Sequence, residues 1–314
     1  MKDKVVTVFG GSGFIGRYVV RDLLARGARV RIAGRNPGEG WFLKTQGGLG
    51  QTQFVAADIR KPASVARALA GSHAAVNLVG ILTGDFTAFH VDGARHVAEA
   101  AAAAGCGALV HVSALGADSA SASRYGQSKG DGEAAVRAAS PAATILRPSV
   151  VFGREDGFVN RFAGLIAMLP IVPVIRGAAK FQPVYVGDVS TAVCTALGDP
   201  AAYGGRTYEL GGPEVISMAA LNRWIAAETG HKRPFVVMPD AVAGAMASLT
   251  GWLPGAPMTR DQWLMLQSDN VVTGDDGLAA LGIAPTPLAA VTDGWLVRYR
   301  RHGRFAETAP TRSG

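Results

Sequence analysis

Tyr125 and Lys129 stand four positions apart in a segment that predicts a helix over 125–139. This spacing places both side chains on one helix face, and a lysine ammonium beside a phenol is expected to lower the pKa of the tyrosine. Such a tyrosine can act as the general acid or base that moves a proton to or from a carbinol oxygen. Ser113 follows a predicted strand and could hydrogen-bond the same oxygen. The alternative is a structural or cofactor-holding pair, because the spacing by itself is common.

A glycine-rich loop lies near the start of the chain, between an apolar run at 5–9 and a segment that predicts a helix over 14–26. Gly10, Gly13 and Gly16 follow the spacing G-x-x-G-x-x-G. The first permits a tight turn, the second lets the backbone approach a pyrophosphate, and the third lets the helix pack on the sheet. The helix N-terminus offers free N–H groups to phosphates. The pattern predicts a dinucleotide site built from Gly10, Ser12, Gly13, Phe14, Ile15 and Gly16.

The end of the second predicted strand, 29–33, bears on which nicotinamide dinucleotide binds. An NAD-binding protein usually has an acidic residue there for the ribose hydroxyls, whereas this chain continues with Gly34 and Arg35. Arg35 can pair with a 2′-phosphate in bidentate fashion, so NADP(H) is favoured and NAD(H) is the alternative. Asp58 follows the third predicted strand, where it could accept a hydrogen bond from the adenine amino group or cap the next helix.

These residues are positioned by strands and helices that alternate over the first half of the chain. The alternation predicts an α/β fold, a Rossmann-type doubly wound parallel sheet. After about residue 150 prolines become frequent and the apolar segments become helical. We therefore expect an NAD(P)-binding domain over 1–150, a smaller, mixed but largely helical substrate or partner lobe over 151–304 that can exchange strands with it, and a disordered tail over 305–314. Helices are predicted at 14–26, 62–70, 87–104, 125–139, 218–228, 241–253 and 260–267, and strands at 5–9, 29–33, 53–57, 74–79, 108–112 and 143–146.

Composition narrows the class of protein. A net charge of +7 favours anionic partners such as phosphates or an anionic membrane surface. No helix-turn-helix, zinc or RNA-binding signature occurs, so nucleic-acid binding is not expected. Cys106 and Cys194 support neither a disulfide framework nor a metal site. The chain enters a strand without a signal-peptide pattern and has no apolar run of membrane-spanning length, which predicts a cytoplasmic protein.

The loop, the strand-end serine and the tyrosine-lysine pair together resemble the short-chain dehydrogenase/reductase superfamily, in its extended and atypical, epimerase/dehydratase-like branches. Within it, the chain resembles the NADPH-binding accessory subunit family of respiratory complex I and its bacterial relatives. This narrower resemblance is carried by residues 76–82, 111–117, 145–153, 182–189, 207–214 and 258–262.

The resemblance implies a bound NADPH, a structural or regulatory role, and a peripheral position near the membrane arm of complex I, here on the cytoplasmic face of the inner membrane. It also implies a loop after Arg147 that closes over the nicotinamide end. Residue by residue, it implies that the cofactor is lined by Gly10, Gly13, Gly16, Arg35, Asp58, Ile59, Asn77, Val79, Gly80, Tyr125, Lys129 and Pro148.

One departure from that family leaves several functions open. The mitochondrial subunits do not reliably keep the tyrosine-lysine pair, whereas this chain has Tyr125 and Lys129. The chain is therefore expected to be an accessory protein that holds NADPH, an active NADP-dependent reductase, dehydrogenase or epimerase on a small hydroxy, keto or quinone-related compound, or a redox-sensing regulator. The apolar stretch 241–258 is expected to contact a quinone-handling partner, a membrane interface or its own domain.

Overall fold

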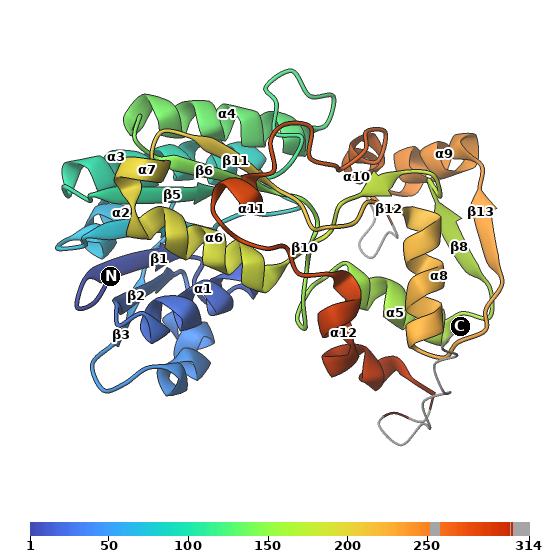
Figure 1. Ribbon diagram of the computed structural model, residues 1–314. Helices are drawn as coiled ribbons and strands as arrows, with labels where there is room; N and C mark the ends of the chain where they lie inside the picture. Colours follow the sequence, from blue (N-terminus) through green and yellow to red (C-terminus); the bar gives the residue numbers. More distant parts are fainter. Residues whose placement is uncertain (252–257, 302, 304–314) are drawn as a thin grey trace.

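The main sheet of the protein has seven parallel strands in the order β11-β6-β5-β4-β1-β2-β3 (Figure 1). The computed structural model describes residues 1–251, 258–301 and 303. Because the strand order reverses between β1 and β4, a crevice opens at the carboxyl ends of these two strands. The predicted doubly wound parallel sheet is confirmed. Its strands are β1 (Val5–Phe9), β2 (Arg29–Gly34), β3 (Thr52–Ala56), β4 (Ala74–Asn77), β5 (Ala108–Val112), β6 (Thr144–Pro148) and β11 (Thr207–Leu210).

Helices cover both faces of this sheet because its strands are apolar on both sides. On one face α1 (Phe14–Ala25) packs beside α6 (Val186–Gly198), and the core between them and the sheet includes Val6 and Val8. On the other face Phe9 and Ala75 belong to the core beneath α2 (Pro62–Leu69), α3 (Gly93–Ala103) and α4 (Arg124–Ala139). Shorter elements are η1 (Pro37–Gln46), η2 (Thr87–Asp92), α7 (Pro200–Tyr203) and α11 (Gly277–Ala280).

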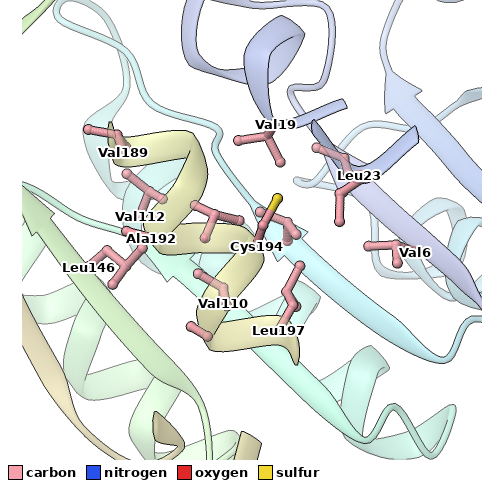
Figure 2. Packing of buried hydrophobic residues seen from close by; sticks show 14 of the residues in the cluster. Val6, Val19, Leu23, Val110, Val112, Leu146, Val189, Ala192, Cys194 and Leu197 are labelled. Atoms are coloured by element: carbon pink, nitrogen blue, oxygen red, sulfur yellow. The ribbon is translucent and has the colours of Figure 1, made fainter. Parts of the chain in front are cut away.

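Figure 2 shows the packing around α6, which the sequence did not assign to this domain. Ala192 of α6 lies beside the strand residues Val112 and Leu146, and Leu197 belongs to the same buried cluster as Val110 and Leu23 of α1. Cys194 lies in the same layer, and burial raises the pKa of its thiol to about 12. This cysteine is therefore an unreactive packing residue.

The chain crosses back into the main sheet after residue 150. Strand β11 pairs with β6 in parallel, in a register that runs from Thr207 opposite Ile145 to Leu210 opposite Pro148. Together with α6 and α7, it completes the first domain. The chain therefore leaves the first domain at about residue 150, as predicted, but later returns to it, because strand pairing joins segments that are far apart in the sequence.

The second lobe is a mixture of helices and short strand pairs, as predicted. Its strands form the pairs β7–β10, β9–β12 and β8–β13, and its core includes Phe152, Ile166, Leu221 and Trp295. The elements are β7 (Val151–Phe152), α5 (Val159–Met168), β8 (Val172–Ile175), β9 (Lys180–Phe181), β10 (Val184–Tyr185), β12 (Ile216–Ser217), α8 (Met218–Glu228), β13 (Phe235–Met238), α9 (Asp240–Thr250), α10 (Arg260–Met265), α12 (Leu288–Leu296) and η3 (Val297–Tyr299).

Several local predictions can be compared with these elements. Ser217 caps α8 through the Ala220 amide, and Thr259 forms a capping box with Gln262 at α10. Asp240 is not the predicted cap, because it is already the first residue of α9 and its carboxylate pairs with Arg176. The helix predicted over 87–104 begins as a π-helical turn, η2. Residues 252–253 and the tail 305–314 lie outside the described residues.

Helix α9 contains most of the described part of the apolar stretch. Ala243 and Ala247 are buried against its own domain, whereas Val242 is 52% exposed and Leu249 is 74% exposed. One face of α9 therefore packs on its own domain, and the other presents apolar side chains to solvent. None of the helices in 1–251 and 258–301 is both long and apolar enough to cross a membrane.

Candidate functional site

A cavity of about 1270 Å³ lies at the carboxyl ends of the central strands and extends into the second lobe. This is the strand-order reversal at which open α/β sheets bind ligands. The predicted site residues come together here. Its lining includes Gly10, Ser12, Gly13, Phe14, Ile15, Gly16, Arg35, Asp58, Ile59, Val79, Gly80, Ser113, Tyr125, Lys129 and Pro148.

The glycine loop has the geometry that a bound pyrophosphate requires. Gly10 turns with a φ of +78°, a left-handed conformation that favours glycine. A Cβ on Gly16 would lie 2.2 Å from the Gly10 carbonyl oxygen, so loop and helix approach too closely for any side chain there. No side chain in the described chain caps the α1 N-terminus, where Gly13 is the N-cap residue. Its first-turn amides can therefore bind phosphate oxygens.

Cationic side chains follow the ends of β2 and β3. Arg35 is exposed, and its guanidinium carbon lies 5.7 Å from the centre of the Phe89 ring. Arg60 contacts the same ring at 4.8 Å and binds the Asp58 carboxylate at 2.6 Å. The hydrogen bonds from Arg60 lower the pKa of Asp58. Asp58 does not cap α2, which begins after Lys61 without a side-chain cap.

Tyr125 and Lys129 both project from α4 into the cavity wall, as their spacing predicts. Lys129 is 5% exposed, and its ammonium donates to the Val112 carbonyl oxygen at 3.3 Å. Burial lowers the pKa of Lys129 to about 8, so the ammonium predominates at pH 7. The Lys129 Nζ atom lies 5.9 Å from the centre of the Tyr125 ring.

The pKa of Tyr125 differs from the expectation. Burial raises the pKa of this hydroxyl to about 12, and Lys129 does not offset the effect at its present distance. Desolvation disfavours the phenolate more than the ammonium stabilises it. Tyr125 is therefore a protonated phenol at neutral pH, which suits it to donate a proton.

His90 packs against the Tyr125 ring. Sequence spacing did not identify His90 as a residue of the site. Its Nε2 accepts a hydrogen bond from the Ile81 amide at 3.0 Å, so the proton resides on Nδ1, which lies 2.9 Å from the Ser128 hydroxyl. Ser128 in turn donates to the Tyr125 carbonyl oxygen at 2.9 Å. Burial lowers the pKa of His90 to about 3, which keeps the ring neutral. The ring meets the Tyr125 ring edge to face at 5.5 Å and so helps to orient it.

Ser113 has a hydroxyl that is free for a ligand. Its side chain is buried at the end of β5, and its Oγ has no hydrogen-bond partner among the described residues. Buried hydroxyls are normally paired. An oxygen of a bound molecule beside Tyr125 would supply the missing partner.

Asn77 is the one predicted cofactor residue that does not line the cavity. Its Oδ1 accepts a hydrogen bond from the Val79 amide at 3.1 Å, and its Nδ2 lies 3.2 Å from Nδ1 of the buried His111. Asn77 therefore shapes the loop after β4, and Val79 and Gly80 form the wall in its place.

Asp261 joins the second lobe to the start of the tyrosine-bearing helix. Its carboxylate accepts hydrogen bonds from the backbone amides of Arg124 at 2.6 Å and Tyr125 at 3.1 Å. A carboxylate is favoured at this position because the N-terminus of a helix carries partial positive charge. The contact spans 137 positions of the sequence, so no local pattern could have indicated it.

Replacing Asp261 with alanine is expected to lower the free energy of unfolding by about 1–2 kcal/mol, because two charge-assisted hydrogen bonds to α4 are lost. Asp131→Ala, which removes a carboxylate from α4 itself, is the control. Urea denaturation measures the difference, and hydrogen exchange should accelerate at the amides of Arg124 and Tyr125. Equal stability of the two variants would show that Asp261 does not hold the helix.

Comparisons with known proteins match this architecture. The NAD dependent epimerase/dehydratase family matches residues 6–211. The chain is 36% identical to NADH dehydrogenase (ubiquinone) 1 alpha subcomplex subunit 9, mitochondrial, of Mus musculus, over 98% of this chain and 85% of that protein. The Arabidopsis thaliana protein of the same name is 33% identical, over 95% and 79%. A structure of the NADPH-dependent quinone oxidoreductase QOR2 of Escherichia coli, complexed with NADPH, superposes with a TM-score of 0.74 at 20% identity, covering 91% of this chain and 97% of that one.

Proposed function

The chain belongs to the NAD dependent epimerase/dehydratase family, and on that premise we propose that it holds NADP(H) as an accessory protein of respiratory complex I. The observation that carries the proposal is the likeness over nearly the whole chain to subunits named for that complex, combined with an intact dinucleotide cradle. The likeness includes the second lobe, so it is not confined to a common nucleotide-binding domain.

The choice of NADP(H) is supported by Arg35, which lines the cavity. Its guanidinium lies over the Phe89 ring directly after the end of β2, and no carboxylate in the described part of the chain pairs with it. A 2′-phosphate would find a bidentate partner there. The NADPH complex of the structurally similar quinone oxidoreductase agrees with this assignment.

Replacing Arg35 with serine is expected to raise the Kd for NADPH about tenfold or more and to leave the Kd for NADH nearly unchanged, because one charge-assisted hydrogen-bonded pair is lost. Fluorescence titration of the reduced nucleotides measures both constants. Arg67→Ser, at an exposed position of α2, is the control. An equal rise in the Kd for NADPH and for NADH would show that Arg35 contacts a part of the cofactor that the two nucleotides share.

Association with complex I is tested in the native cell. A tagged chain is expected to co-purify with complex I, and to lie on the cytoplasmic face of the inner membrane as a peripheral protein. Native gel electrophoresis followed by detection of the tag measures the association with complex I. Fractionation of the tagged chain as a free species, with none at the mass of complex I, would contradict the accessory role.

A second candidate function is an active reductase, and the unpartnered Ser113 hydroxyl is the observation that favours it. When bound, the reduced dinucleotide supplies a hydride. The chain's own residues would do the rest: Ser113 would hold the substrate oxygen, Tyr125 would donate the proton, and Lys129 would stabilise the tyrosinate left behind. NADPH that exchanges readily would favour this candidate, whereas tightly held NADPH would favour the accessory role.

A further inference from the structure

The lobe half of the cavity is predominantly apolar. Phe158 packs edge to face on Phe162 at 5.1 Å and at a tilt on Phe181 at 5.4 Å, and all three line the cavity. The apolar lining also reaches the surface, where Leu165 is 36% exposed and Met265 is 38% exposed. A ligand with an extended apolar portion would fill this half.

The side-chain oxygens of three polar residues in this half are already occupied by the protein. Asp261 accepts from the amides of α4, Gln262 Oε1 accepts from the Thr259 amide at 3.1 Å, and Asn270 Oδ1 accepts from the Ser149 hydroxyl at 2.7 Å. Arg161 is the one cation of the lobe lining among the described residues. A nucleotide-sugar needs several cations for its diphosphate, so this lining does not suit one.

Asn222 also belongs to the lining of this half, and it is the exception because its side-chain oxygen lacks a partner. The residue is 1% exposed on α8, and its Nδ2 donates to the Met218 carbonyl oxygen at 2.8 Å. A carbonyl can only accept, so this bond determines the orientation of the amide and identifies the other atom as Oδ1. No group in the described ranges of the chain donates to that Oδ1. A buried acceptor left unpaired costs free energy, which a donor on a ligand would offset.

We propose that the lobe half binds a long-chain, lipid-like carbonyl compound that carries a hydrogen-bond donor, a hydroxyl or an amide N–H, which pairs with Asn222 Oδ1. The inference rests on the NADP(H) binding of the proposed function and on the reductase candidate, since it takes the dinucleotide to occupy the other half and the carbonyl to lie beside Tyr125. In the reduction, a hydride from NADPH joins the carbonyl carbon and the Tyr125 proton joins the oxygen. The products are the alcohol and NADP⁺, and the tyrosine regains its proton from solvent. Oxidised quinone rings offer acceptors only, so they would leave Asn222 unpaired.

Straight-chain methyl ketones of dodecanone length test the donor requirement. One set carries a single hydroxyl near the carbonyl, at mid-chain or at the far end, and a matched set carries a methyl ether at each position. Binding to the NADPH-loaded protein is followed through the NADPH fluorescence, which requires no turnover. At least one hydroxy ketone is expected to bind about tenfold tighter than its ether. Equal binding within every pair would overturn the proposal.

Replacing Asn222 with leucine is expected to abolish this preference, so that each hydroxy ketone binds no tighter than its methyl ether. Asn222→Ala provides a second variant if leucine disturbs packing. A preference that persists in both variants, or tighter binding of a short-chain ubiquinone analogue that ignores both substitutions, would also overturn the proposal. NADPH affinity is measured separately for each protein. Loss of NADPH binding by the wild-type protein would refute the proposed function, whereas normal NADPH binding without ketone discrimination would refute only the present inference.

Discussion

Replacing Gly16 with alanine is expected to weaken NADPH binding about 100-fold. The added Cβ would lie 2.2 Å from the Gly10 carbonyl oxygen and 2.7 Å from the Gly11 Cα, and both are backbone atoms of the phosphate-binding loop. Neither can move aside as a flexible side chain would, so the loop must separate from α1. Overpacking of this kind costs about 1–3 kcal/mol, and the upper end of that range corresponds to roughly a hundredfold change in Kd.

Gly34→Ala is the matched control for Gly16→Ala. Gly34 also lines the cavity, next to Arg35, but a Cβ there would meet no atom within 4 Å. Its NADPH affinity is therefore expected to stay within about twofold of wild type. Fluorescence titration measures both affinities, and far-ultraviolet circular dichroism verifies that each variant is folded. A Gly16→Ala protein that binds NADPH as the control does would show that the dinucleotide is not held by this loop.

The parts of the site that sequence could predict are those whose function depends on local spacing. Gly10, Gly13 and Gly16 must follow one strand and open one helix, so their positions in the chain already determine their positions in space. The same is true of Tyr125 and Lys129, one helical turn apart on α4. For these residues, the helix or strand that carries them is sufficient to position them.

The parts that sequence did not predict depend on contacts between distant segments. Asp261 reaches the start of α4 from the second lobe, and β11 enters the sheet beside β6 only after the chain has left it. His90 lies in a π-helical turn that a regular helical period does not anticipate. Asn222 has an ordinary position on an amphipathic helix, and only the three-dimensional accounting of hydrogen bonds distinguishes it.

The pKa of Tyr125 likewise depends on one property that sequence spacing predicts and on another that only the folded structure determines. Spacing correctly placed a lysine near the tyrosine, but the sign of the pKa shift depends on how much water surrounds the hydroxyl, which is a tertiary property. Burial dominates and keeps Tyr125 protonated, with a pKa of about 12. A protonated Tyr125 is suited to donate a proton to a carbonyl oxygen.

Replacing Tyr125 with phenylalanine is expected to reduce turnover of long-chain ketones about 1000-fold, the contribution typical of a well-placed general acid. The Kd for NADPH should remain nearly unchanged, because phenylalanine keeps the ring contacts with His90 and Phe86 and removes only the hydroxyl. Tyr208→Phe, which removes a buried hydroxyl from β11, is the control. Consumption of NADPH measures turnover, and fluorescence titration measures affinity.

The pH dependence of the wild-type protein identifies the partner of Tyr125. Lys129 has a pKa lowered to about 8, so its ammonium is present below pH 8 and is lost as the pH rises through that value. Tyr125 stays protonated over the same range. Turnover should therefore fall above about pH 8, and a Lys129→Met variant should be slow at every pH without that fall. If Tyr125→Phe turns over ketones at the wild-type rate, the catalytic candidate is refuted. A wild-type protein that binds NADPH tightly and reduces none of the ketones would instead support the accessory role, because the same cradle then serves to retain the cofactor.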